Sequence, residues 1–227
     1  MFDIDFEPFV LSLKLAFAST IILFFITLPL SYVMSRVKFK TKPLLEGLVS
    51  LPLVLPPSVL GFYLLIFLSP YSPLGGFIER VFDVRLVFNF TGLVVASCIY
   101  SLPFMFSPLY AGFNSLKPSL FEASYSLGKG KISTLFHVAL PNIKPNLLTA
   151  IVVSFAHTMG EFGVVLLIGG SVQGETKVAS IAIFEAVEML DYTKAHVYAA
   201  LMLAVSFCVL FMVYYLNAKH AKIGYNG

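Results

Sequence analysis

The sequence predicts an all-α protein: a polytopic bundle of transmembrane helices that forms a single domain over residues 1–227. Hydrophobic residues make up 58% of the chain and charged residues 12%, which leaves too little polar surface to cover a soluble globule. Five apolar stretches reach the length of about 20 residues that a helix needs to cross a bilayer. They run over 9–35, 47–69, 90–113, 146–169 and 197–216.

The charges between these stretches predict how the chain is oriented. Lysines and arginines follow the first stretch, surround the segment 117–144 and follow the last stretch, at Arg36, Lys38, Lys40, Lys42, Lys117, Lys129, Lys131, Lys144, Lys219 and Lys222. The opposite loops are acidic on balance. Positively charged loops stay in the cytoplasm, so we expect a multi-pass cell-membrane protein with its N-terminus outside and its C-terminus inside. The acidic residues Asp3, Asp5 and Glu7 argue against a cleaved signal peptide.

The second stretch carries Pro52, Pro56 and Pro57 at membrane depth. Each proline removes a backbone donor that surrounding protein or water must compensate, so we expect broken helices packed inside the bundle.

Two shorter apolar segments lie on the acidic side. In 77–88, the residues Ile78, Val81, Phe82 and Arg85 have helical spacing, which predicts a helix at the surface. The segment 178–190 is too short to cross a bilayer unaided. We expect an interfacial or re-entrant helix. The alternative is a sixth span, which would reverse the membrane orientation of the last stretch.

The segment between the third and fourth stretches is polar and patterned. It reads EASYSLGKGKISTLFHVALP over 122–141, with anchor residues Glu122, Ala123, Ser124, Gly128, Val138, Leu140 and Pro141. This spacing resembles the cytoplasmic E-A-A-x3-G-x9-I-x-L-P loop of ABC-importer permeases, with Ser124 in place of the third alanine and Val138 in place of isoleucine. A plain connector is the alternative interpretation.

An acidic residue stands inside the fourth stretch, in the sequence HTMGEFG. An ionised carboxylate at this depth is costly, so we expect Glu161 to face the bundle interior or a pore. Gly160 and Gly163 would let another helix approach closely, and His157, one turn earlier, is placed to hydrogen-bond Glu161. These four residues are candidates for a translocation path or gate, with simple helix packing as the alternative.

The sequence lacks the motifs of an enzyme. It contains no G-x-x-x-x-G-K-[ST] phosphate loop, no zinc-protease motif and no nucleophile elbow. Cys98 and Cys208 lie far apart in apolar stretches and have no metal-ligand spacing. We expect no catalytic residues, metal or cofactor, and the scattered charges of a chain with net charge +3 give no basis for nucleic-acid binding.

Several segments together resemble the molybdate permeases, within the molybdate/sulfate permease group of ABC importers: SLPLVLPPSVLGFYLL, YSLPFMFSPL, the patterned loop, HTMGEFGVVLLIGG and GET. The resemblance covers nearly the whole chain, from Leu11 to Leu216. It implies an ABC-importer permease bundle that imports molybdate, with tungstate or sulfate as alternative substrates.

The same resemblance implies partners and residue roles. Two permease copies would pair with two copies of an ATPase subunit, and an extracytoplasmic oxyanion-binding protein would deliver the substrate. Residues 122–128 would form the helix that couples to the ATPase, and 160–163 would lie near the permease dimer interface and the substrate path. An ATP-independent channel or carrier would account for the hydrophobicity but would leave the patterned loop unexplained.

Overall fold

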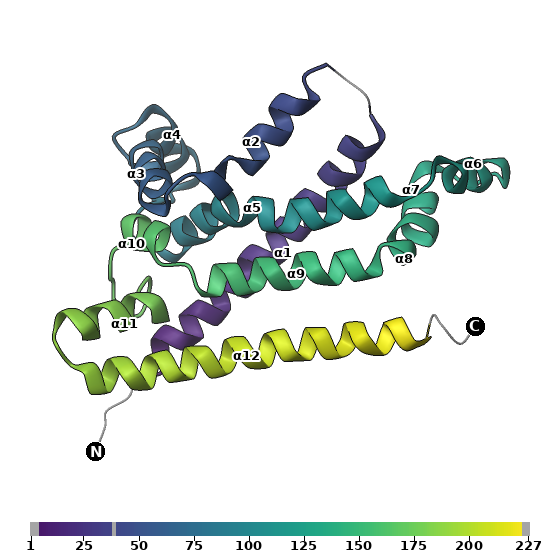
Figure 1. Ribbon diagram of the computed structural model, residues 1–227. Coiled ribbons are helices and arrows are strands. Elements are labelled where there is room, and N and C mark those ends of the chain that lie inside the picture. Colours follow the sequence, from purple (N-terminus) through teal and green to yellow (C-terminus); the bar gives the residue numbers. More distant parts are fainter. Residues whose placement is uncertain (1–4, 38–39, 224–227) are drawn as a thin grey trace.

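The computed structural model describes residues 5–37 and 40–223, except for the side chains of Val213 and residues 216–223. Every regular element in these residues is helical (Figure 1), which confirms the predicted all-α class. The elements are α1 (Glu7–Arg36), α2 (Lys42–Val54), α3 (Pro57–Leu68), α4 (Pro73–Phe82), α5 (Phe90–Ser115), α6 (Pro118–Ser126), α7 (Lys131–Thr134), the π-helical turn η1 (Leu135–Ala139), α8 (Leu140–Asn142), α9 (Lys144–Met159), α10 (Gly163–Gly169), α11 (Ala179–Glu188) and α12 (Tyr192–Ile223). Asp3, Lys38 and the side chains of Lys219 and Lys222 lie outside the described part.

Three helices form the centre of the bundle. α1, α5 and α9 pack against one another, and α12 runs beside α9 and α11 (Figure 1). Leu23 of α1, Met105 and Leu109 of α5, and Ala150 of α9 are buried where these helices meet. The core of the bundle therefore lies where α1, α5 and α9 meet.

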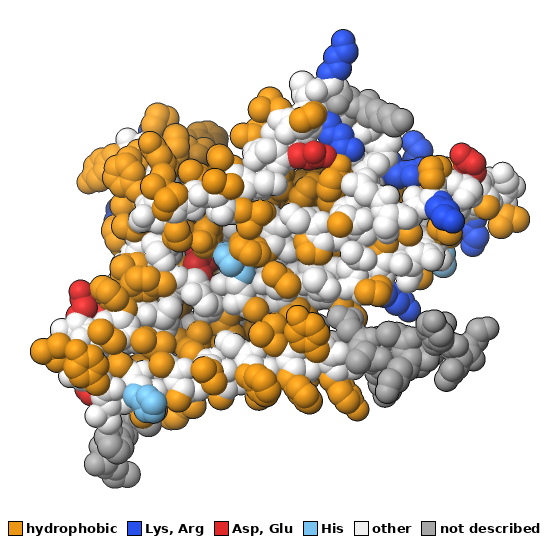
Figure 2. Space-filling view, in the orientation of Figure 1, with side chains coloured by type: hydrophobic (Ala, Val, Ile, Leu, Met, Phe, Trp, Pro, Cys, Tyr) orange, Lys and Arg blue, Asp and Glu red, His pale blue; other side chains and the backbone are white. Residues whose placement is uncertain are grey.

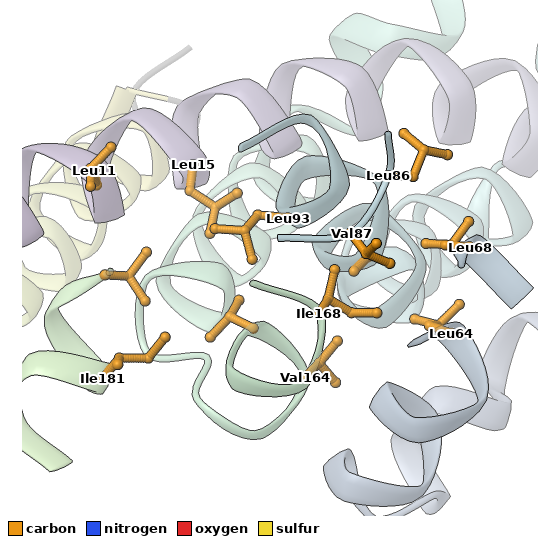
Figure 3. Close-up of a cluster of buried hydrophobic side chains, with 13 residues drawn as sticks. Leu11, Leu15, Leu64, Leu68, Leu86, Val87, Leu93, Val164, Ile168 and Ile181 are labelled. Atoms are coloured by element: carbon orange, nitrogen blue, oxygen red, sulfur yellow. The ribbon is translucent and has the colours of Figure 1, made fainter. Parts of the chain in front are cut away.

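A second apolar cluster lies at the end of the bundle where α1 begins. Leu15 of α1 and Leu93 of α5 meet Val164 and Ile168 of α10 there (Figure 3), and all four side chains are almost fully buried. Leu64 and Leu68 of α3 belong to the same cluster. The cluster fixes the short helices α3 and α10 against the long α5.

The second predicted stretch is broken, as its prolines predicted. α2 and α3 meet at an angle of 111°, because Leu55 is extended and neither Pro56 nor Pro57 can donate a backbone hydrogen bond to continue the helix. Tyr110 of α5 donates a hydrogen bond to Glu46 and so ties α2 to the bundle. In the single chain Pro52 is buried, whereas Pro56 and Pro57 are exposed. The packing of this broken stretch inside the assembled bundle stays a prediction.

The fourth predicted stretch does not form one helix. α9 ends at Met159, and the chain turns through residues 160–162 before the seven-residue α10 begins. α1, α5 and α12 are the three described helices that are individually long and apolar enough to cross a membrane. Five spans result only if each bent pair counts as one, α2 with α3 and 131–142 with α9. The five-span count remains a prediction.

The two shorter segments form helices at the end of the bundle where α12 begins (Figure 1). α4 ends at Phe82, because the next residue, Asp83, adopts a left-handed conformation (φ 53°) that stops the helix. The prediction that Arg85 belongs to this helix is therefore wrong; its Nε instead lies 2.7 Å from the Glu79 carboxylate. α11 has 10 residues and is about 15 Å long, too short to cross a bilayer.

Candidate functional site: a patterned segment and a central cavity

The patterned segment folds into α6, α7, η1 and α8 at one end of the molecule (Figure 1). Phe121 anchors α6 to the end of α1: its ring is fully buried, and the Arg36 guanidinium lies 3.8 Å from the ring centroid. Tyr32 stands beside the same ring, with centroids 6.5 Å apart. Cations over aromatic faces are attracted by the ring quadrupole, so Arg36 and Tyr32 hold α6 in place.

Ser124, which departs from the alanine of the motif, has a structural partner. Its hydroxyl lies 2.9 Å from the Thr134 hydroxyl, and both side chains are buried. Since buried hydroxyls require hydrogen-bond partners, the pair fixes α6 against α7. The sequence pattern alone does not reveal this contact, because Thr134 is not an anchor residue of the motif.

Gly128 ends α6 in a left-handed conformation, with φ +77°. The Gly128 N–H donates to the Tyr125 carbonyl (2.9 Å), and the Lys129 N–H donates to the Ser124 carbonyl (3.1 Å). These two bonds form a Schellman motif, in which glycine is favoured because a Cβ would be strained. A Cβ at Gly128 would meet nothing within 4 Å, so the backbone conformation requires this glycine and close packing within the chain does not.

The outer surface of this segment is apolar in part. Leu127, Ile132 and Phe136 are 80%, 75% and 57% exposed, and Glu122 and Ala123 are also exposed. Lysines and arginines gather around the same end of the molecule (Figure 2). Exposed apolar side chains within a charged surface are typical of a protein interface.

The last anchor residues lie farther along the segment. Val138 and Leu140 are half-buried and Pro141 is exposed, after a π-helical turn at 135–139. Leu140 packs against the core formed by α1, α5 and α9. The structure thus joins this part of the motif to the bundle.

A cavity of about 630 Å³, which we call the central cavity, opens where α9 ends and α3 begins. It contains all four predicted path residues, and its lining is Pro57, Ser58, Tyr100, Ala156, His157, Gly160, Glu161, Phe162 and Gly163. Sequence reasoning missed Ser58 and Tyr100, which come from α3 and α5. Ser58 and Tyr100 reach the cavity because α2 and α3 are bent and because helices far apart in the chain pack together, which the sequence does not show.

His157 does not bond Glu161, and the helix-packing alternative holds for it: it is a polar residue satisfied at the interface of α9 and α5. Its Nδ1 lies 3.0 Å from the Ser101 hydroxyl, which in turn lies 2.8 Å from the Thr158 hydroxyl. The imidazole stacks on Phe104 at a centroid distance of 3.7 Å and lies 4.7 Å from the Tyr100 ring. α5 therefore determines the orientation of this side chain.

Glu161 lies in the break between α9 and α10 and is 4% exposed. Neither carboxylate oxygen has a hydrogen-bond partner, and neither of the two ion pairs in the described residues includes it. Its backbone carbonyl accepts a hydrogen bond from Ser180 of α11 at 2.6 Å. The structure agrees with the expectation that this side chain faces the protein interior.

The two candidate glycines differ in their packing. A Cβ at Gly163 would lie 2.8 Å from Cβ of Pro57, so this glycine permits close contact between α10 and α3. A Cβ at Gly160 would meet only carbonyls of α9, none nearer than 3.7 Å. In the part of the chain that is described, no cluster of three or more His, Cys, Asp or Glu side chains is placed to hold a metal ion.

Comparison with known proteins identifies the family. Residues 27–222 match the family of binding-protein-dependent transport system inner membrane components. The molybdenum transport system permease protein ModB of Azotobacter vinelandii is 40% identical over 94% of each chain. The sulfate transport system permease protein CysT of Salmonella typhimurium is 30% identical over 93% of this chain and 76% of its own.

Solved structures share the fold. A bacterial alginate ABC transporter in complex with an alginate-bound periplasmic protein gives a TM-score of 0.80 at 18% identity, covering 98% of this chain and 81% of the other. The MetNI methionine ABC transporter, in an inward-facing conformation, gives 0.70 at 16% identity, covering 91% of each chain. The bundle is thus of the ABC-importer permease type. This chain belongs to the family of binding-protein-dependent transport system inner membrane components, and it is the permease component of an ABC importer.

Proposed function

We propose that this chain forms the translocation path of an ATP-driven importer for molybdate. The observation that carries the proposal is 40% identity to a molybdenum transport permease over 94% of both chains. A second relative, a putative molybdenum transport permease of Bacillus subtilis, is 32% identical over 92% of both chains. Sulfate is the second candidate substrate, because sulfate permeases match at about 30% identity.

We assign coupling to the α6 segment, residues 117–142. Glu122, Ala123 and the exposed Leu127 would dock on an ATPase subunit, which hydrolyses ATP in place of this chain. Phe121 and Ser124 face inward and fix α6 to α1 and α7. A displacement of α6 would therefore be transmitted to the bundle. The Schellman turn at Gly128 gives α6 a defined end.

The remaining anchors belong to the same assignment. Val138, Leu140 and Pro141 would join the docking helix to α9, since Leu140 packs on the central core. Two ATPase subunits and a second permease copy complete the proposed assembly, and an extracytoplasmic binding protein delivers the anion. The orientation follows from charge: the lysine-rich α6 end lies in the cytoplasm, and the starts of α1 and α12 lie outside.

The central cavity is the proposed part of the path. His157, Gly160, Glu161 and Gly163 line it together, and it lies at two helix breaks, where half-helices meet in many transporters.

Substrate competition tests this proposal. The complete complex, reconstituted in vesicles with its ATPase and binding protein, should accumulate radiolabelled molybdate when ATP is present. Unlabelled molybdate and tungstate should compete, and sulfate should compete less well. Preferential uptake of sulfate would show that sulfate, and not molybdate, is the substrate.

A further inference from the structure

We propose that the central cavity is a transient binding site for the tetrahedral oxyanion, built from uncharged hydrogen-bond donors of Ser58, Tyr100 and His157. This inference rests on the proposed function and adds to it the residues that hold the anion during transit. Transport requires such a site to bind weakly, because an anion held too tightly does not leave. A site without lysine or arginine meets that requirement.

The position of the cavity favours an anion. Pro57 and Ser58, which begin the 12-residue helix α3, line it. The N-terminal end of a helix carries partial positive charge and free N–H groups. Val59 and Leu60 donate to the Pro56 carbonyl, so Ser58 is the α3 residue at the cavity that supplies both a backbone N–H and a hydroxyl.

His157 is oriented to donate into the cavity. Its ring stacks on Phe104 and contacts Tyr100, and its Nδ1 is occupied by Ser101. We assign the chain of hydrogen bonds so that Thr158 donates to Ser101, and Ser101 donates to Nδ1. The ring proton then resides on Nε2, the nitrogen that the hydrogen bond to Ser101 leaves free for an anion.

Glu161 gives a second and independent indication of a polar ligand. It lines the same cavity and is almost fully buried, and both carboxylate oxygens lack a partner. Natural proteins rarely leave buried polar groups without a partner. An ionised carboxylate would repel a dianion and is costly when unpaired, so we assign Glu161 the neutral acid form when the anion is bound.

The test uses variants of His157 in the complete reconstituted complex. His157→Phe keeps an aromatic ring against Phe104 and removes both nitrogens, whereas His157→Gln retains an N–H donor. The readout is molybdate transported per ATP hydrolysed at saturating loaded binding protein. Losing one hydrogen bond to a charged group corresponds to a change of about ten- to hundredfold. We expect that loss in His157→Phe and substantial recovery in His157→Gln.

His196→Ala is the matched control, since His196 is exposed on α12 and is not part of the cavity lining; it should transport normally. Ser101→Ala should lower the ratio and Ser101→Thr should restore it, because threonine keeps the hydroxyl that orients the ring. If His157→Phe fails to assemble, Tyr100→Phe combined with Ser58→Ala removes two of the proposed donors and should lower the same ratio.

Normal transport per ATP in His157→Phe, or in the double variant when it is needed, would overturn the site and leave the importer intact. Failure of the wild-type complex to take up molybdate, tungstate or sulfate would instead overturn the proposed function. The two failures are therefore distinguishable in the same vesicles.

Discussion

The hydroxyls of Ser124 and Thr134 lie 2.9 Å apart in a buried contact that joins α6 to α7. Ser124→Ala restores the alanine of the motif but leaves the Thr134 hydroxyl buried without this partner, at a cost of about 1–3 kcal/mol. We expect Ser124→Ala to lower the thermal stability of the assembled complex. The double variant Ser124→Ala/Thr134→Val should recover most of the loss, and an additive loss in the double variant would contradict the pairing.

Arg36 and Phe121 give a second prediction about the same segment. Arg36→Gln removes the cation over the ring at 3.8 Å, an interaction of about 0.5–2 kcal/mol. If this contact transmits motion from α6 to α1, uptake per ATP should fall while ATP hydrolysis continues. Arg36→Lys should give an uptake per ATP between those of wild type and Arg36→Gln, because lysine keeps the charge without the planar group. Equal loss of hydrolysis and uptake would indicate failed assembly instead.

Gly128 is expected to tolerate asparagine better than valine. Its φ of +77° suits glycine and, next best, asparagine, whereas a β-branched residue there is a strained outlier. Gly128→Val should abolish ATP-driven uptake while the permease still inserts, and Gly128→Asn should retain much of it. A Cβ at Gly128 meets no neighbour within 4 Å, so Gly128→Val acts through the backbone conformation alone. Full uptake with Gly128→Val would show that the turn plays no part in coupling.

Cysteine labelling tests the proposed orientation. In a background that carries Cys98→Ala and Cys208→Ala, Gln173→Cys should react with a membrane-impermeant maleimide added to intact cells. Lys131→Cys should react only after permeabilisation. Both positions are exposed, so accessibility depends on the side of the membrane. The reverse labelling pattern would mean that the protein has the opposite orientation in the membrane.

Glu185 makes a pH-dependent contribution to the loop between α10 and α11. Partial burial acts to raise its pKa, but hydrogen bonds from Lys177 and Ser171 and the lysine charge outweigh burial, and the pKa lies below its ordinary value of 4.5. A carboxylate with a lowered pKa stabilises the fold above its unfolded pKa, and this contribution is lost as the pH falls through the folded pKa. Glu185→Gln should therefore lower thermal stability at neutral pH, and the difference from wild type should shrink below pH 4.5. A constant difference would contradict the ion pair.

Sequence reasoning predicted the long helices well. The first and third stretches, 9–35 and 90–113, became α1 (Glu7–Arg36) and α5 (Phe90–Ser115), because continuous apolar runs and flanking polar residues mark such helices clearly. Pro56 and Pro57 also located the break in the second stretch. The bend of 111° was not predictable, since it depends on how α3 packs against α10 and α5.

The candidate sites were predictable only in part. The four path residues lie close in sequence, and the structure brings them together in one cavity. The actual partner of His157 is Ser101, 56 positions away, which local spacing cannot reveal. The break at 160–162 was missed although Gly160, Glu161 and Gly163 interrupt the apolar run there. Arg85 was misplaced because helical spacing gives no sign that Asp83 adopts a left-handed conformation.

Whether uptake requires ATP hydrolysis by a partner subunit tests the proposed importer most directly. Vesicles that contain the permease, the ATPase and the loaded binding protein should concentrate radiolabelled molybdate above its external level with ATP. They should not do so when the ATPase subunit carries a hydrolysis-blocking substitution. Equal molybdate entry through the permease without a working ATPase would contradict an ATP-driven importer and identify a channel or carrier.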